Sequence, residues 1–104
     1  MTRKTDYTNE AQQRLMRLVL VMFGDVVNGY PPSVLAKAVG CAQPVITRDL
    51  DNLATAGWAE RDEEALTWRL TPRLPQQAVK VFTAVDKAER RAEQARQRFT
   101  RSPD

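Results

Sequence analysis

Few side chains of this sequence are equipped for catalysis or metal binding. Cys41 is the single cysteine among 104 residues and histidine is absent, which excludes both a Cys–His nucleophile pair and a cysteine–histidine zinc site. The adjacent acids Asp62, Glu63 and Glu64 lie in a segment of turn composition, where such groups are solvated. There is no phosphate-binding glycine loop and no pair of carboxylates in an evident cleft. We therefore expect no enzyme, no metal and no cofactor.

The charge is distributed unevenly along the chain. Residues 1–68 hold seven Lys/Arg and nine Asp/Glu, a net charge of −2, whereas residues 69–104 hold nine Lys/Arg and four Asp/Glu, a net charge of +5. No apolar run approaches the roughly 20 residues that cross a bilayer, and no signal-peptide pattern follows the longest one. We expect a cytoplasmic protein without membrane contact, whose positive field lies in its C-terminal third.

Hydrophobic periodicity predicts three helices in the first half of the chain. The first begins at Glu10, behind a cap at Thr8 or Asn9, and carries apolar residues every three or four positions from Ala11 to Phe23. A short second helix runs from about Pro32 or Ser33 to Val39. The third runs from about Gln43 to Ala56. Glycines 40 and 57 follow these two helices, in the position that tolerates a left-handed backbone.

The second half predicts a hairpin and one more helix. Alternating apolar residues favour strands over residues 58–61 and 66–70, on either side of an acidic turn at residues 62–65. Thr71-Pro72 ends the hairpin. Pro75 opens a final helix from about Gln76 to Phe99.

The stretch from Val34 to Trp58 resembles the DNA-binding domain of IclR-type transcription regulators and, more distantly, MarR-type winged helices. The matching features are Leu35-Ala36, Val39-Gly40, Arg48, Leu50, Leu53, Gly57 with an aromatic residue after it, and the segment Trp68-Arg69-Leu70-Thr71-Pro72. The resemblance covers roughly residues 12–72. It implies a mainly α fold with a small β-hairpin. Together with the residue pattern on either side, this predicts a flexible arm (1–8), a winged helix-turn-helix domain (9–72) and a long C-terminal helix with a frayed end (73–104).

The resemblance further implies that the third helix enters the major groove of duplex DNA with its N-terminal turn leading. Glutamine can form two hydrogen bonds with adenine, and threonine or proline can contact a thymine methyl group. Arg48 suits a phosphate better than a base, and basic residues on other elements are candidates for further phosphate contacts. The expected DNA-binding residues are Gln43, Pro44, Thr47, Arg48, Asn52, Lys37, Arg61, Arg69, Arg14 and Arg17.

Two acidic features depart from that family pattern. Asp49 and Asp51 place two negative charges on the third helix, where DNA phosphates would repel them. Asp49 escapes this repulsion if it points away from the groove. The wing tip, residues 62–64, is acidic where a phosphate contact favours Arg or Lys.

The last helix carries a seam of small and apolar residues, spaced by alternating threes and fours from Ala78 onward. Three interpretations stay open: a dimer interface matched to two operator half-sites, packing against the first helix of the same domain, and a basic tail that touches nucleic acid. The expected dimerisation residues are Val81, Val85, Ala88, Ala92, Ala95 and Phe99.

These observations favour a sequence-specific, double-stranded DNA-binding transcriptional regulator that acts as a homodimer. The chain ends where IclR-type proteins begin their effector domain, so we expect a ligand-independent repressor with no small-molecule effector. Short winged helices of this kind resemble regulators carried by phages and other mobile elements. The alternative is a winged-helix protein–protein interaction module that does not bind DNA, which the acidic wing tip and the net charge of −2 support.

Overall fold

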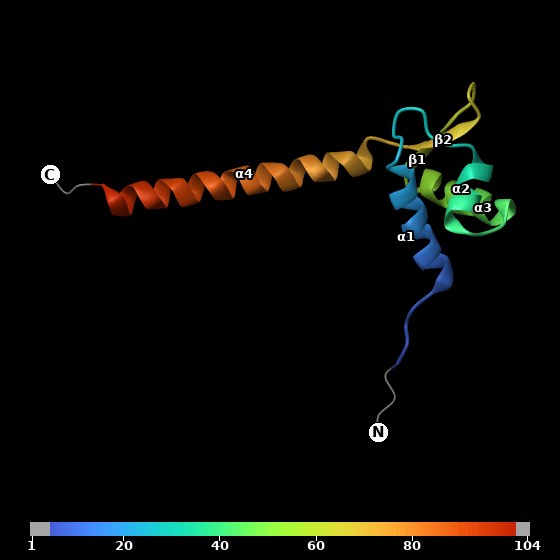
Figure 1. Cartoon of the computed structure of the whole chain (residues 1–104), viewed down its shortest axis with the longest axis horizontal. Coiled ribbons are helices and arrows are strands. Elements are labelled where there is room, and N and C mark those ends of the chain that lie inside the picture. The colour runs from blue at the N-terminus through green and yellow to red at the C-terminus, as the bar shows by residue number, and fades with distance from the viewer. Residues whose placement is uncertain (1–4, 102–104) are drawn as a thin grey trace. The chain divides into compact units, whose positions relative to one another are not determined.

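A computed structural model describes residues 5–101, which form two units divided between Thr71 and Pro72 (Figure 1). Within the described residues the protein is mainly helical and has a two-stranded antiparallel sheet, as the sequence predicts. The elements are α1 (Glu10–Met22), α2 (Pro32–Val39), α3 (Gln43–Thr55), β1 (Ala59–Asp62), β2 (Thr67–Leu70) and α4 (Arg73–Thr100). Of the predicted arm, residues 5–8 have no regular secondary structure and residues 1–4 lie outside the described range, as do residues 102–104 of the predicted frayed end.

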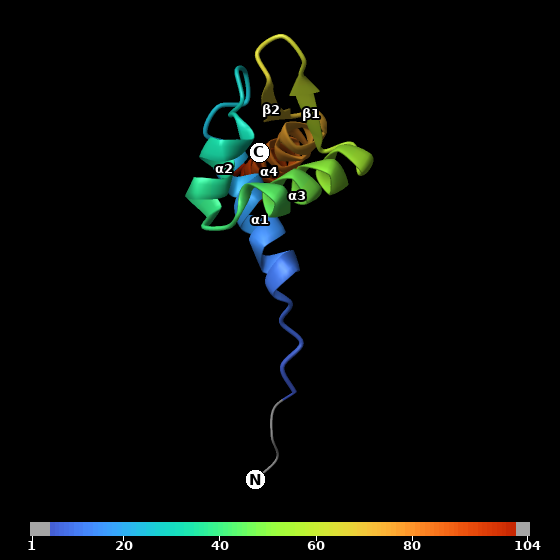
Figure 2. The ribbon, with the colours of Figure 1, turned by 90° about the vertical axis from the view of Figure 1, so that its right-hand side faces the viewer.

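The first unit is built around a small apolar core. In it α1 packs on α2, α2 on α3, α3 on β1, and α1 on β2 (Figure 2). Burial of these apolar side chains is the main favourable contribution to folding of this unit. The largest fully buried side chains are Leu18, Met22, Leu35, Ile46 and Leu50.

The start of α1 follows from a side-chain cap, and its end corrects the predicted apolar face. The side-chain oxygen of Asn9 accepts a hydrogen bond from the backbone N–H of Gln12 at 3.1 Å, which satisfies one of the orphan amides of the first turn. Ala11 and Phe23, both predicted on the buried face, are exposed. Phe23 is the C-cap residue, so it lies beyond the last turn that packs against the core.

α3 ends in a hydrogen-bonding pattern that decides where the hairpin begins. The Gly57 N–H donates to the Ala54 carbonyl at 2.9 Å, and the Trp58 N–H donates to the Leu53 carbonyl at 2.8 Å. This pair of bonds is the Schellman motif, with Gly57 in the left-handed region at φ 79°. Because its amide closes the helix, Trp58 does not join the strand, and β1 begins one residue later than predicted.

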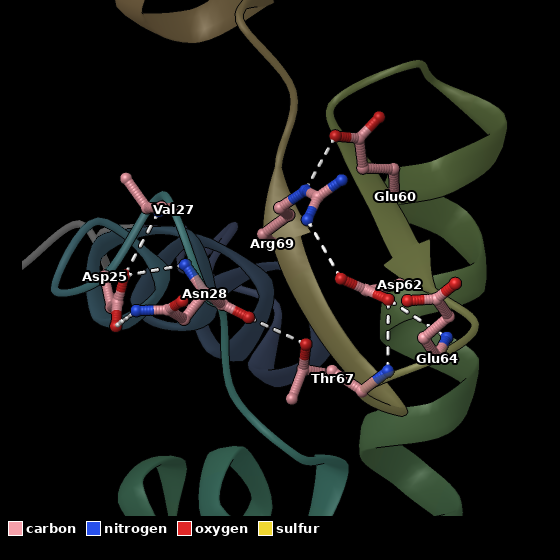
Figure 3. A network of polar contacts seen from close by, with 9 residues as sticks. Asp25, Val27, Asn28, Glu60, Asp62, Glu64, Thr67 and Arg69 are labelled. Atoms are coloured by element: carbon pink, nitrogen blue, oxygen red, sulfur yellow. Dashed lines mark hydrogen bonds and ion pairs between the residues drawn. The ribbon is translucent and has the colours of Figure 1, made fainter.

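A segment before α2 pairs with β2 on the edge that does not face β1. Tyr30 and Trp68 exchange backbone hydrogen bonds of 2.9 and 2.8 Å in an isolated antiparallel bridge. Gly29 adjoins this bridge with φ 72°, and a Cβ there would collide with the Trp68 carbonyl oxygen. The Thr67 hydroxyl donates to the Asn28 carbonyl at 2.7 Å (Figure 3). The backbone around Gly29 is thus held close to β2, a contact that a side chain would prevent.

The second unit consists mainly of α4, which begins earlier than predicted. Pro75 lies in its first turn, where the missing N–H would have no intrahelical partner. No residue of this 28-residue helix is buried. Among residues 5–101, no helix combines the length and apolar character needed to span a bilayer.

Candidate nucleic-acid interface

An open hollow of about 360 Å³ lies where the first turns of α3 approach the hairpin. Its lining combines polar, cationic and apolar side chains from the start of α2, from α3, and from the hairpin. Three sequence-predicted site residues meet there, namely Gln43, Thr47 and Arg61. The fold therefore brings together hydrogen-bonding groups of α3 and a guanidinium of β1. The full lining is Pro32, Gln43, Thr47, Arg61, Leu66 and Trp68.

The solvent-facing side of α3 continues this surface. The helix buries Ile46, Leu50 and Leu53 on one side, so the residues on the opposite side are left in solvent. The Thr47 hydroxyl donates to the Gln43 carbonyl at 3.0 Å, which leaves its oxygen able to accept. The exposed residues of this side include Gln43, Pro44, Thr47, Arg48, Asp51 and Asn52.

Asp49 does not belong to that exposed side. Its carboxylate receives two hydrogen bonds from the guanidinium of Arg14 in α1, from Nε to Oδ2 at 2.7 Å and from Nη2 to Oδ1 at 3.1 Å. The side chains of Arg14 and Asp49 are 21% and 10% exposed, and this hydrogen bond raises the pKa of Arg14. The negative charge of Asp49 is thereby neutralised on the side of α3 that faces Arg14 of α1. Arg14, predicted to contact a phosphate, is thus engaged with Asp49.

Asp51, two residues further on, is exposed. It is therefore the acid of α3 that an approaching anion would meet. The Asn52 side-chain amide donates to the Arg48 carbonyl at 2.9 Å, which leaves the oxygen of that amide able to accept. The exposed face of α3 thus offers hydrogen-bonding groups and one cation, Arg48, next to one carboxylate.

The hairpin holds Arg69 in an internal network. Its Nε donates to Glu60 at 2.9 Å and its Nη1 donates to Asp62 at 3.2 Å, as Figure 3 shows. The bond to Glu60 is the main cause of the raised pKa of Arg69, with Asp62 adding to it. Arg69, predicted to contact DNA, is engaged with two carboxylates of the neighbouring strand. The sequence indicated both charges, but the pairing depends on the register that sets Glu60 opposite Arg69.

Asp62 also organises the turn of the hairpin. Its Oδ1 accepts backbone N–H groups from Glu64 and Ala65 at 3.0 and 3.1 Å. These bonds, with the Ala65 amide first, lower the pKa of Asp62 despite some desolvation. One of the three carboxylates at residues 62–64, that of Asp62, therefore stabilises the hairpin turn itself.

Arg61 is the hairpin cation that stays accessible. Its Nη1 lies 3.6 Å from the Glu63 carboxylate, and the two side chains are 45% and 78% exposed. Exposed ion pairs at such a distance hold a side chain weakly. The Arg61 guanidinium can therefore leave Glu63 and pair with an anion that binds it more strongly. Lys37 on α2 and Arg17 on α1 are exposed as well, but neither lines the hollow.

Comparison of the chain with protein-family models, with curated proteins and with solved structures gives no match.

Three residues of the hollow were not among the predicted site residues: Pro32, Leu66 and Trp68. The sequence pattern predicts Leu66 in the returning strand. It instead occupies the turn with φ 56°, the single positive φ of a non-glycine residue among residues 5–101. A left-handed leucine is strained, and no local sequence signal announces it. The sequence predicts Trp68 as an apolar residue of the hairpin, and in the structure this half-buried residue lines the hollow.

Proposed function

We propose that residues 9–72 form a winged helix-turn-helix that binds duplex DNA. In this interpretation α2 and α3 are the helix-turn-helix and the β1–β2 hairpin is the wing. The observation that carries the proposal is the hollow in which Gln43, Thr47 and Arg61 converge beside the exposed side of α3. Such a surface offers base-edge hydrogen bonding from a helix and a phosphate contact from the adjoining hairpin. The resemblance to IclR-type DNA-binding domains supports the same proposal.

The few accessible cations on this face favour a mode of DNA binding that needs two copies of the protein. Pairing with Arg14 neutralises Asp49, while Arg48 and Arg61 remain exposed. Asp51 opposes them, and the Arg69 guanidinium is engaged with Glu60 and Asp62. One copy would therefore make few phosphate contacts, and phosphate contacts supply much of the affinity for DNA. We propose that the protein acts as a homodimer on two half-sites, as a ligand-independent transcriptional repressor.

The test begins with selection of bound duplexes from a random-sequence pool, because the operator is unknown. Affinity for the enriched duplex is then measured by fluorescence anisotropy over a salt series. We expect Arg61→Ala and Arg48→Ala each to weaken binding and to reduce the salt slope by about 1, the change for one lost phosphate contact. Lys80→Ala is the matched control, since it removes one exposed cation from α4, and it should keep the wild-type slope.

Trp68 provides a second, local readout because its ring lines the hollow. In a Trp58→Phe background, Trp68 is the only tryptophan that remains. We expect its emission to change on titration with the enriched duplex. The proposal is overturned if no duplex is enriched and none binds at low salt. It is also overturned if binding is indifferent to Arg48→Ala and Arg61→Ala.

A second candidate function is a winged-helix module that binds a protein segment. Half of the hollow is apolar, formed by Pro32, Leu66 and Trp68, and Asp51 lies on the adjoining exposed side of α3. These features suit a basic segment with one apolar side chain better than they suit DNA. Absence of DNA binding at low salt, together with a Trp68 emission change on adding a lysine- and leucine-containing peptide, would favour this alternative.

A further inference from the structure

α4 is a long helix whose apolar side chains are exposed. Val81, Val85 and Phe99 are 59%, 47% and 83% exposed, and no residue of α4 is buried. Helices in water owe most of their stability to an apolar face packed on a partner. The residues at heptad spacing are Leu74, Ala78, Val81, Val85, Ala88, Ala92, Ala95 and Phe99. Of these, Leu74 is half-buried and the others are exposed.

We propose that α4 pairs with α4 of a second copy in antiparallel orientation and in one register. Val81 then faces the partner's Ala92, and Val85 faces the partner's Ala88. Ala78 meets the partner's Ala95, and Leu74 meets the partner's Phe99. This inference rests on the homodimer of the proposed function and specifies its geometry.

Side-chain size favours this register over a parallel pair. In a parallel pair each seam residue faces its own copy, so Ala88, Ala92 and Ala95 would form three consecutive alanine layers. Alanine layers close only when the helices approach to about 8 Å, whereas larger side chains hold them near 10 Å. Valine layers before them and a Phe99 layer after them would therefore leave cavities, which are destabilising. The antiparallel register instead sets a larger residue against a smaller one in both valine layers.

Charge favours the same orientation. The half of α4 from residue 87 to 100 holds five basic and two acidic residues, a net charge of +3, whereas residues 73–86 have a net charge of +1. A parallel pair lays the +3 halves side by side. In particular it brings Arg91 next to the partner's Arg96, which flank the seam at facing heptad positions. The antiparallel pair sets each +3 half against a +1 half, and it also aligns the helix dipoles favourably.

The orientation determines where the two DNA-binding units are attached. In the antiparallel register Arg73 lies level with the partner's Thr100, so the two copies of Arg73 are 27 residues apart along the axis. At 1.5 Å per residue this is about 40 Å. A parallel pair would instead bring both attachment points to about 10 Å.

Cysteine cross-linking of the full chain tests the inference without DNA. In a Cys41→Ser background, Val81→Cys protein and Ala92→Cys protein are mixed and oxidised under equilibrating thiol–disulfide conditions. We expect the mixed 81–92 disulfide to rise well above the half share that random pairing gives. Lys80→Cys and Glu93→Cys form the control pair, because they lie at the same level of the register but outside the seam. They should show no such preference.

Each other result overturns the inference. A dominance of 81–81 and 92–92 disulfides indicates a parallel pair. A chain that stays monomeric in analytical ultracentrifugation, with no disulfide above the control pair, excludes the α4 interface.

Spin labels give a check that needs no substitution in the seam. The antiparallel pair predicts a short distance at Lys87 and an axial separation of about 32 Å at Gln76, from 21 residues of rise, whereas a parallel pair predicts similar distances at both. Because no DNA is present, failure here is distinguishable from failure to bind DNA.

Discussion

The guanidinium of Arg14 in α1 binds the carboxylate of Asp49 in α3 through two hydrogen bonds of 2.7 and 3.1 Å. The two residues are 35 positions apart, and their pairing links the first helix to the third. Asp49 therefore lies on the side of α3 that faces Arg14 of α1, whereas Asp51 faces solvent. Two carboxylates on one helix therefore have different roles, one structural and one on the candidate interface.

Substitution of the two aspartates should separate these roles. Asp49→Asn leaves the Arg14 guanidinium without its anionic partner in a half-buried site, so we expect a clear loss of stability in urea unfolding. Asp51→Asn should change the free energy of unfolding by no more than about 0.5 kcal/mol. It should also strengthen DNA binding, because it removes a charge that repels phosphate. Equal stabilities of the two variants would contradict the structural role of Asp49.

Gly29 and Gly40 form a matched pair for backbone strain. Both have left-handed φ values, 72° and 83°, but a Cβ at Gly29 would collide with Trp68, while a Cβ at Gly40 would meet nothing within 4 Å. Gly40→Ala should lose roughly 1–2 kcal/mol from the left-handed backbone alone. Gly29→Ala should lose a further 1–3 kcal/mol or so from the collision. Urea unfolding measures both, and similar losses would exclude the close approach of Gly29 to β2.

Relief of strain at Leu66 should stabilise the hairpin. Its φ of 56° favours glycine, and its side chain is 54% exposed. We expect Leu66→Gly to be more stable than Leu66→Ala by up to about 1 kcal/mol, because both remove the side chain but only glycine accepts the backbone. Thermal unfolding of the two variants provides the comparison. If alanine is the more stable, the turn has another conformation in solution.

Acid should weaken the loops that Asp25 and Asp62 organise. Backbone hydrogen bonds, from Asn28 to Asp25 and from Ala65 to Asp62, lower the pKa of each carboxyl below its ordinary 3.8. As the pH falls past 3.8 the unfolded chain therefore takes up protons first. The contribution to stability is present above that value and is lost as the pH falls through the lowered pKa.

The variants Asp25→Asn and Asp62→Asn should accordingly be less stable than wild type at neutral pH. They should also lose less stability between neutral pH and pH 3. Urea unfolding across this range measures the effect. Glu64→Gln, which removes an exposed carboxyl of the same turn, is the control and should change the free energy of unfolding at neutral pH by no more than about 0.5 kcal/mol. A parallel downward shift for the aspartate variants, with unchanged pH dependence, would contradict the proposed cause.

Local pattern was sufficient for the helices and for the presence of the hairpin. Apolar spacing, a helix cap at Thr8 or Asn9 and the left-handed glycines 40 and 57 act within a few residues, so the sequence alone predicted them, and the structure shows Asn9 as the cap. Prediction was wrong at element ends that depend on contacts. The Trp58 amide binds the Leu53 carbonyl instead of entering the strand, and α4 extends back to Arg73 through Pro75.

The sequence by itself determined which polar groups α3 presents, because helical periodicity separates Gln43, Thr47 and Arg48 from the buried Ile46 and Leu50. Only the tertiary structure decided which charges remain accessible. Arg14 and Arg69 looked equivalent to Arg61 as isolated cations, yet partners from another helix and another strand engage the first two. The physical reason is that an ion pair depends on distance in space, and the packing of α1 near α3 and the register of the hairpin set those distances.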